Sequence, residues 1–100
     1  MKTEDAVSII KSISSSLRDL GVKRVSIFGS TARGDARDDS DVDLLIEFSE
    51  GHKSFDSFMD VADVLESAFP VSVDVLTPEA LNPARRFRIL SESVYYEITP

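Results

Sequence analysis

The amino-acid sequence predicts an α/β (α+β) fold, in which helices pack on a small mixed β-sheet of three to four strands. Short β-rich runs alternate along the chain with segments whose apolar residues recur every three or four positions, a pattern typical of helices layered on a sheet. The chain has 100 residues, 42% of them hydrophobic, which suits one soluble core of ordinary size. We therefore expect residues 1–100 to form a single domain.

The first third of the chain is expected to form a helix, a strand and a short second helix. The first helix covers residues 3–20, with Thr3 as its cap and Gly21 at its end. Its apolar face consists of Ala6, Ile9, Ile10, Ile13, Leu17 and Leu20. The β-rich run KRVSIF, residues 23–28, is interrupted by Gly29-Ser30, and one or two helical turns should follow before Gly34.

The remainder of the chain is expected to contain three strands and two helices. The strands are residues 42–48, 71–76 and 94–98, the last of them at the edge of the sheet. One helix runs from residue 55 to 69 and is stopped by Pro70, and the other begins at Asn82-Pro83 and reaches about Leu90. The helix over 55–69 should bury the stripe formed by Phe55, Phe58, Ala62, Leu65 and Phe69.

The composition excludes several classes of function. The net charge of −7 argues against direct binding to a nucleic-acid backbone, but it is compatible with metal ions or a basic protein partner. The chain has no cysteine, so disulfide frameworks and Cys-based zinc sites are ruled out. Because no stretch approaches about 18 apolar residues and the N-terminus has no apolar signal region, we expect a cytoplasmic protein without a membrane partner.

Two aspartates enter a strand that otherwise looks buried. In the segment FGSTARGDARDDSDVDLL, residues 28–45, Asp41 and Asp43 fall on one strand face, while Val42 and Leu44 fall on the other. The two carboxylates are about 6.6–6.8 Å apart along the strand at about 3.3–3.4 Å per residue. Their repulsion requires neutralisation, and oxygen ligands without Cys or His favour a hard cation such as Mg²⁺. The three preceding aspartates, Asp35, Asp38 and Asp39, are expected in a solvated connector.

A third carboxylate and an anion-binding turn extend this pattern. Asp74 lies on the polar face of the strand over 71–76, so it can approach Asp41 and Asp43 if the two strands are neighbours. Three carboxylates on adjacent strands can hold two metal ions, an arrangement that suits nucleotidyl transfer. Backbone N–H groups at the Gly29-Ser30 turn can cradle phosphate, and Arg33 and Arg37 follow closely enough to meet its charge. An EF-hand reading of Asp39 to Glu50 fails because its position 6 is Leu44 instead of glycine.

The combined spacing resembles a known family. Gly29-Ser30, ten residues and Asp41-x-Asp43, with Ala32-Arg33-Gly34 and Ser40 in place, is similar to the minimal nucleotidyltransferases of the DNA polymerase β superfamily. Many of these small proteins are antitoxins paired with HEPN toxins. The resemblance is dense over residues 25–48, and it departs at Thr31, where many members have an arginine.

By this resemblance, each residue of the motif has an expected role. Gly29 and Ser30, helped by Arg33, would hold the triphosphate of ATP. Asp41, Asp43 and Asp74 would be the catalytic carboxylates and the ligands of Mg²⁺, two ions in all. The implied reaction transfers AMP to a hydroxyl, and Asp74 could act as its general base.

The resemblance also implies a protein partner. Larger relatives carry a second domain that helps to hold the acceptor, so we expect another polypeptide to complete the site, in a homo- or hetero-oligomer. That partner would be a HEPN-type toxin, modified on a tyrosine. Two alternatives stay open: a non-catalytic antitoxin that neutralises its partner by binding, and transfer to RNA or a small molecule. Three arginines of the last helix, Arg85, Arg86 and Arg88, are either a solvated basic face or contacts to nucleotide or partner.

Overall fold

The computed structural model describes residues 1–98 and shows one mixed four-stranded sheet. The strands are β1 (Val22–Phe28), β2 (Val42–Phe48), β3 (Val73–Leu76) and β4 (Val94–Glu97). Their spatial order is β3-β2-β1-β4, so β4 is an edge strand, as predicted. β1 pairs antiparallel with both β2 and β4, whereas β2 and β3 run parallel. The α/β class and the mixed sheet predicted from the sequence are confirmed.

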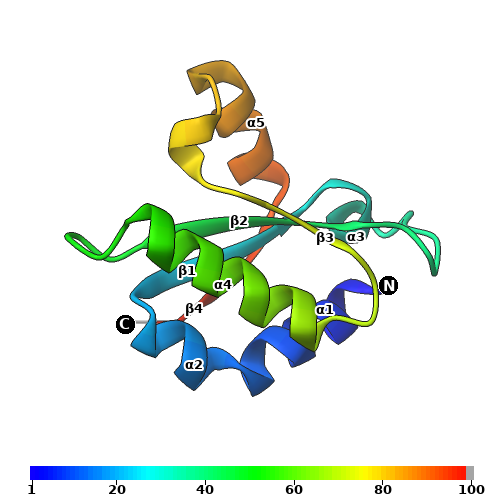
Figure 1. The fold of residues 1–100 in the computed structure, drawn as a ribbon. Coiled ribbons are helices and arrows are strands. Elements are labelled where there is room, and N and C mark those ends of the chain that lie inside the picture. Colours follow the sequence, from blue (N-terminus) through cyan, green and yellow to red (C-terminus); the bar gives the residue numbers. More distant parts are fainter. Residues whose placement is uncertain (99–100) are drawn as a thin grey trace.

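Helices cover the two faces of this sheet unequally. Figure 1 shows α1 (Thr3–Ser12), α2 (Ser14–Asp19) and α4 (Phe55–Ala68) on one face and α5 (Pro83–Glu92) on the other. The short helix α3 (Gly29–Arg33) follows β1 directly, and a 3₁₀ turn η1 (Pro78–Ala80) leads from β3 to α5. The parallel pair requires a crossover, and α4 provides it, as in a βαβ unit.

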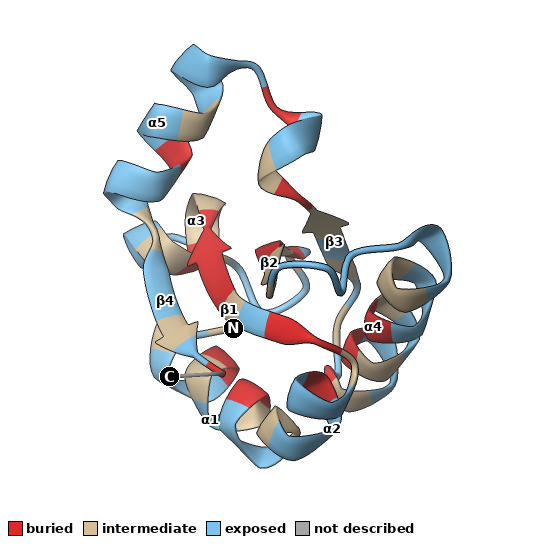
Figure 2. Ribbon diagram, turned by 90° about the vertical axis from the view of Figure 1, so that its left-hand side faces the viewer, coloured by how far each residue is buried: buried red, intermediate tan, exposed pale blue. Residues whose placement is uncertain are grey.

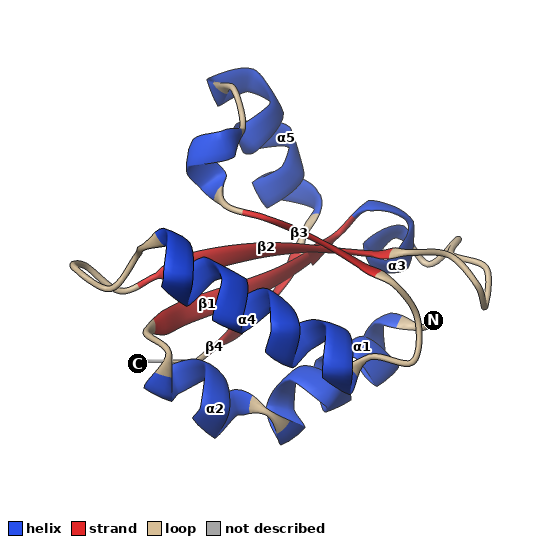
Figure 3. Cartoon of the chain, in the orientation of Figure 1, coloured by secondary structure: helices blue, strands red, loops and turns tan. Residues whose placement is uncertain are grey.

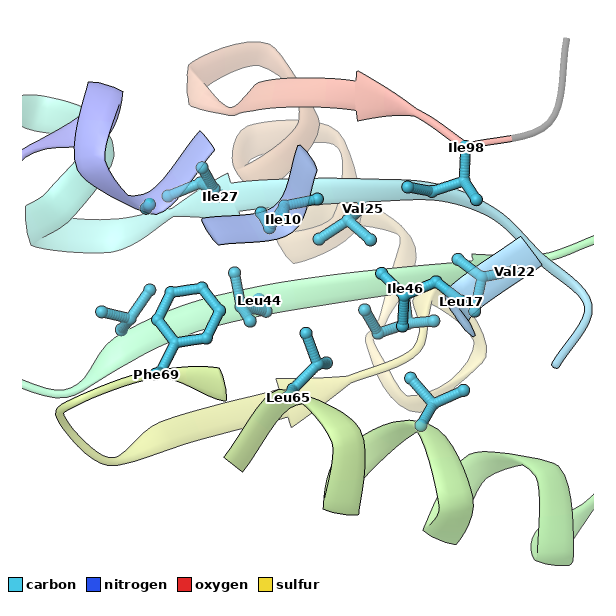
Figure 4. Close-up of a cluster of buried hydrophobic side chains, with 13 residues drawn as sticks. Ile10, Leu17, Val22, Val25, Ile27, Leu44, Ile46, Leu65, Phe69 and Ile98 are labelled. Atoms are coloured by element: carbon cyan, nitrogen blue, oxygen red, sulfur yellow. The ribbon is translucent and has the colours of Figure 1, made fainter. Parts of the chain in front are cut away.

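The main core lies between the sheet and the three helices on the first face. Figure 4 shows Ile10 of α1, Leu17 of α2 and Leu65 of α4 converging on Val25, Leu44 and Ile46 of the sheet. All six side chains are fully buried. Alternate residues of β2, Val42, Leu44 and Ile46, therefore face this core, as the strand pattern predicts.

The helix predicted over residues 3–20 is interrupted. It is divided at Ile13, whose φ of −110° and ψ of 13° depart from helical values, and Figure 3 shows the break between α1 and α2. The apolar periodicity continues through the break, which is why the sequence does not reveal it. Thr3 is also not a cap: its hydroxyl donates a 2.6 Å hydrogen bond to the carbonyl oxygen of Thr31 and so ties α1 to α3.

The predicted buried stripe of α4 is wrong at its first residue. Phe55 is 78% exposed, and the fully buried positions of this helix are Val61 and Leu65. Ser54 caps the helix by accepting a 3.0 Å hydrogen bond from the backbone N–H of Ser57. The cap places Phe55 at the first position of the helix, about one and a half turns or more before the buried residues Val61 and Leu65.

A pair of substitutions tests this correction. Phe55→Ser is expected to change the free energy of unfolding by no more than about 0.5 kcal/mol, because the ring is already in solvent. Leu65→Ala should lower it by about 2–5 kcal/mol, because the side chain is fully buried in the main core. Urea unfolding of both variants measures the contrast, and equal losses would contradict it.

One arginine links three strands at the far end of the second face. Arg24 of β1 pairs with Glu47 of β2 at 3.2 Å and with Glu97 of β4 at 2.7 Å. Its guanidinium also lies 5.1 Å from the centre of the Tyr95 ring. Both glutamates at this end of the face are therefore paired with a cation, whereas Asp43 at the other end lies among like charges. Within residues 1–98, no helix is long and apolar enough to cross a bilayer.

Candidate active site

The second face of β2 carries both apolar and acidic side chains. Leu45 is fully buried there, in a small cluster with Phe28, Leu81 and Ile89. Leu81 and Ile89 come from the segment after η1 and from α5, so this part of the face is covered by protein instead of solvent. Asp43, two residues before Leu45 on the same face, is partly buried beside this cluster. Figure 2 shows α5 standing over this side of the sheet.

The parallel pairing places two of the three predicted carboxylates directly opposite each other. Asp43 on β2 is the register partner of Asp74 on β3, and it faces Phe28 on its other side. Neighbouring strands are about 4.8 Å apart, so carboxylates that share a face in such a pair interact strongly. Asp41 precedes β2 by one residue and is exposed, as is Asp74.

The electrostatics of Asp43 reflect this crowding. Partial burial raises the pKa of its carboxyl above the ordinary value, and the charges of Asp74 and Asp41 raise it further. The positive charges of Arg33 and Arg85 lower the pKa of the same carboxyl. The side chain is thus held among like charges, a situation that a bound cation relieves.

The donor atoms fit a hard divalent cation in kind. They are all carboxylate oxygens, the ligands that Mg²⁺ prefers. Within residues 1–98, no three acidic or histidine side chains lie close enough together, as the side chains stand, to hold a metal ion. Asp41 and Asp74 are exposed, so packing does not confine either side chain to one rotamer.

The Gly29-Ser30 turn packs against the same carboxylate. Gly29 has a φ of +72°, a conformation that residues with a side chain rarely adopt. A Cβ atom at this position would overlap the Oδ2 atom of Asp43 and lie 3.2 Å from its Cγ. The bare backbone of Gly29 therefore lets α3 begin immediately beside the acidic pair.

A cavity of about 530 Å³ joins these elements. Gly29, Ser30, Arg33 and Asp43 line it, which brings together the predicted phosphate-binding residues and one predicted metal ligand. Its remaining lining residues are Phe28 and four residues of α5, namely Arg85, Arg88, Ile89 and Glu92. Asp41, Asp74 and Arg37 are not among the residues that line it.

The three arginines of α5 differ in what they contact. Arg86 is turned toward η1: its Nε donates to the carbonyl oxygen of Pro78 at 3.0 Å and one terminal nitrogen donates to that of Leu81 at 3.4 Å. Arg85 and Arg88 instead line the cavity. The sequence contained a signal for this division, since residues 85, 88, 89 and 92 follow i, i+3, i+4, i+7 spacing and so share one helix face.

Thr31, the position where the sequence departs from the family pattern, lies away from the cavity. Its side chain is 1% exposed, and its hydroxyl has no hydrogen-bond partner among the described residues. Arg33, two residues later, is exposed and lines the cavity. Its Nε atom forms an ion pair with the Oδ2 atom of Asp35 at 3.5 Å. The cationic group nearest to the Gly29-Ser30 turn on α3 is therefore supplied by Arg33.

A larger cavity of about 810 Å³ lies elsewhere, where α4 ends and β3 begins. Its lining includes Asp39 and Glu66 together with Phe69 and Val73, and it contains none of the predicted site residues. The chemistry-bearing side chains gather at the smaller cavity, so we place the candidate active site there.

The site combines three features of an enzyme that handles metal-bound nucleotides. These are carboxylates on adjacent strands, a glycine-serine turn that packs beside them, and a cavity lined by arginines. The comparison with protein families agrees with this class, because residues 9–96 match the nucleotidyltransferase domain. The chain belongs to that family.

The most informative relatives are small proteins of similar length. The chain is 34% identical to the protein adenylyltransferase MntA of Thermococcus cleftensis, over 92% of this chain and 93% of that protein. It is 46% identical to a provisionally named protein adenylyltransferase of Methanocaldococcus jannaschii, over 74% of this chain and 78% of that protein.

Solved structures confirm the fold. A structure provisionally described as a minimal nucleotidyltransferase matches with a TM-score of 0.74 and 36% identity, covering 94% of this chain and 95% of the other. A chain from a toxin–antitoxin crystal structure with AMP-PNP matches with a TM-score of 0.67 at 20% identity, covering 85% of this chain and 69% of that one. The first match supports assignment to the minimal nucleotidyltransferases, and the second shows the fold alone.

Proposed function

We propose that this chain, as a single domain over residues 1–100, transfers AMP from ATP to a tyrosine hydroxyl of a partner protein. The observation that carries the proposal is the pairing of Asp43 with Asp74 beside the Gly29-Ser30 turn, at a cavity large enough for a small ligand. The relatives named as protein adenylyltransferases support the choice of reaction, and the structure with AMP-PNP concerns a protein of the same fold.

We propose a role for each residue of the site, and the positions described above support it. Gly29, Ser30 and Arg33 hold the triphosphate at the wall of the cavity. Asp41, Asp43 and Asp74 would hold two Mg²⁺ ions, which supply charge neutralisation at the phosphates and a lowered pKa of the attacking hydroxyl. Asp74, exposed at the edge of the acidic group, accepts the proton of that hydroxyl as general base. The tyrosine oxygen bonds to the α-phosphorus, the bond from that phosphorus to the bridging oxygen breaks, and pyrophosphate leaves.

We further propose that the partner is a HEPN-type toxin and that this chain is its antitoxin. Exposed apolar residues on the side of α5 that faces away from the cavity support a partner on this helix. Phe87 is 77% exposed and Leu90 is 40% exposed on α5, three residues apart and therefore neighbours on the helix surface. A partner that covered this surface would be held on the helix that also forms one wall of the cavity. The same surface favours the alternative function, neutralisation by binding alone.

Incubation of the two proteins with ATP and Mg²⁺ tests the transfer. We expect the mass of the partner to increase by one or more AMP groups, and the increase should disappear when Asp41 is replaced with alanine. The second function is separated by a toxicity assay with the same variant. If Asp41→Ala transfers no AMP yet still neutralises the partner, binding is the function, and no AMP transfer by the unaltered chain would contradict the enzymatic proposal.

A further inference from the structure

The face of α5 that lines the cavity carries two unpaired cations. Arg85, Arg88, Ile89 and Glu92 lie on one side of the helix, and Ile89 is 8% exposed in the small cluster over β2. Because Ile89 fixes this side toward the sheet, Arg85 and Arg88 are directed to the cavity. Figure 1 shows α5 standing over the sheet on the opposite side from α1, α2 and α4.

Among the described residues, neither guanidinium is held in an ion pair or a hydrogen bond, although the charge of Arg85 acts on Asp43. Within residues 1–98, the guanidinium groups of Arg85 and Arg88 form no ion pair and donate no hydrogen bond, although both side chains are exposed. Arg24, by contrast, is paired with two glutamates, and Arg86 donates to two carbonyl oxygens. Within one helix, Arg86 anchors α5 through hydrogen bonds, whereas the guanidinium groups of Arg85 and Arg88 donate none in the part of the chain that the structure describes.

The charge of the cavity is the reverse of the charge of the chain. The whole sequence has 18 acidic and 11 basic side chains, excluding His52. The cavity is lined by three arginines, Arg33, Arg85 and Arg88, against two acidic residues, Asp43 and Glu92. An anionic ligand would be repelled by the protein as a whole but attracted here, and arginines on two walls match a ligand with more than one phosphate group.

We propose that Arg85 and Arg88 bind the β- and γ-phosphates of the nucleotide and so select nucleoside triphosphates over monophosphates. This inference rests on the proposed function, because it assumes that a nucleotide occupies the cavity. The helix is well placed for it: Asn82 caps α5 by accepting a 2.9 Å hydrogen bond from the backbone N–H of Arg85, and Arg86 holds it to η1. The two arginines are then presented from α5 across the cavity from Ser30 and Arg33.

Calorimetric titration of the full chain with a nonhydrolysable ATP analogue and with AMP, both with Mg²⁺, tests the inference. Arg85→Gln and Arg88→Gln should each weaken binding of the analogue about tenfold, which corresponds to about 1.4 kcal/mol, and leave AMP binding unchanged. The double variant should lose most of the preference for the triphosphate. Glu92→Gln, which removes a negative charge from the same helix face, should strengthen binding of the analogue.

Lys11→Gln is the matched control, because it makes the same change of net charge at an exposed position on α1. Unchanged affinity of the double variant for the analogue would overturn the inference and leave the proposed function intact. Equal weakening for the analogue and AMP would also overturn it, because the arginines would then not read the β- and γ-phosphates. Failure of the unaltered chain to bind either nucleotide would instead contradict the proposed function itself.

Discussion

Asp43→Asn is expected to abolish AMP transfer and at the same time to stabilise the folded chain in metal-free buffer. The loss of transfer should be at least about a hundredfold, because a carboxylate proposed to bind the metal becomes a neutral amide. The gain in stability follows from the surroundings of the carboxylate, which is partly buried and repelled by Asp74 and Asp41. An amide has nearly the same shape and none of that repulsion.

The pH dependence of this stabilisation has a definite sign. The pKa of Asp43 is raised in the folded chain, so the folded state holds this proton more tightly than the unfolded state does. Stability of the unaltered chain therefore falls as pH rises from the unfolded pKa, about 3.9, through the raised folded pKa. Above that range the penalty is fully present, and Asp43→Asn should remove it. Below the unfolded pKa the carboxyl is protonated in both states, so the stabilisation should vanish.

Urea unfolding with a metal chelator, at neutral pH and at about pH 3, measures the effect. Asp38→Asn is the control, since it removes an exposed carboxylate from the connector before β2. It should change stability by no more than about 0.5 kcal/mol and leave transfer intact. A variant at Asp43 that is less stable than the unaltered chain at neutral pH would show that the carboxylate makes a favourable contact that outweighs its repulsion.

Gly29→Ala is expected to remove activity by a different route, through steric overlap. The backbone at this position has a φ of +72°, which alone costs a residue with a side chain about 1–2 kcal/mol. The new methyl group would also overlap the Oδ2 atom of Asp43, so either the carboxylate or the start of α3 must move. The carboxylate of Asp43 and the start of α3 both belong to the proposed site. A shift of either by about 1 Å can lower the rate of transfer about a hundredfold.

Gly51→Ala separates the two causes. Gly51 has a φ of +80°, close to that of Gly29, but a Cβ atom there would meet nothing within 4 Å. The control variant should lose about the same 1–2 kcal/mol from backbone strain and retain full transfer. Gly29→Ala should lose more stability than this and most of its activity, measured by urea unfolding and by AMP incorporation. Equal losses of stability for the two variants would mean that the carboxylate moves aside freely.

Local patterns were sufficient to predict most of the elements and one face of the sheet. The alternation of β2 correctly assigned Val42, Leu44 and Ile46 to the main core, because a strand has a strict two-residue period. The adjacency of Asp74 and Asp43 could only be stated as a condition, since strand order and parallel direction depend on the whole topology. The structure meets that condition, while the roles of these residues stay predictions.

What the sequence did not predict depends on contacts between distant segments. The break at Ile13 leaves the apolar period intact, so no local signal marks it. Phe55 has the period of a buried residue, but it lies in the first turn of α4 and is 78% exposed. The position of α5 over β2, which brings Arg85 and Arg88 to Asp43, depends on Leu81 and Ile89 packing on Leu45, a contact between residues far apart in the chain.

That small cluster has a consequence for the motions of the molecule. Among residues 1–98, the main core contains thirteen buried residues, whereas the cluster that holds α5 to the sheet contains four, Phe28, Leu45, Leu81 and Ile89, with Leu76 packed against it. Because separating α5 exposes less apolar surface than disrupting the main core, we expect this helix to open locally at a lower free energy than the core does. A ligand that bridges α3 and α5 would draw its two walls together, and binding of substrate would then slow hydrogen exchange in α5 before it affects the strands.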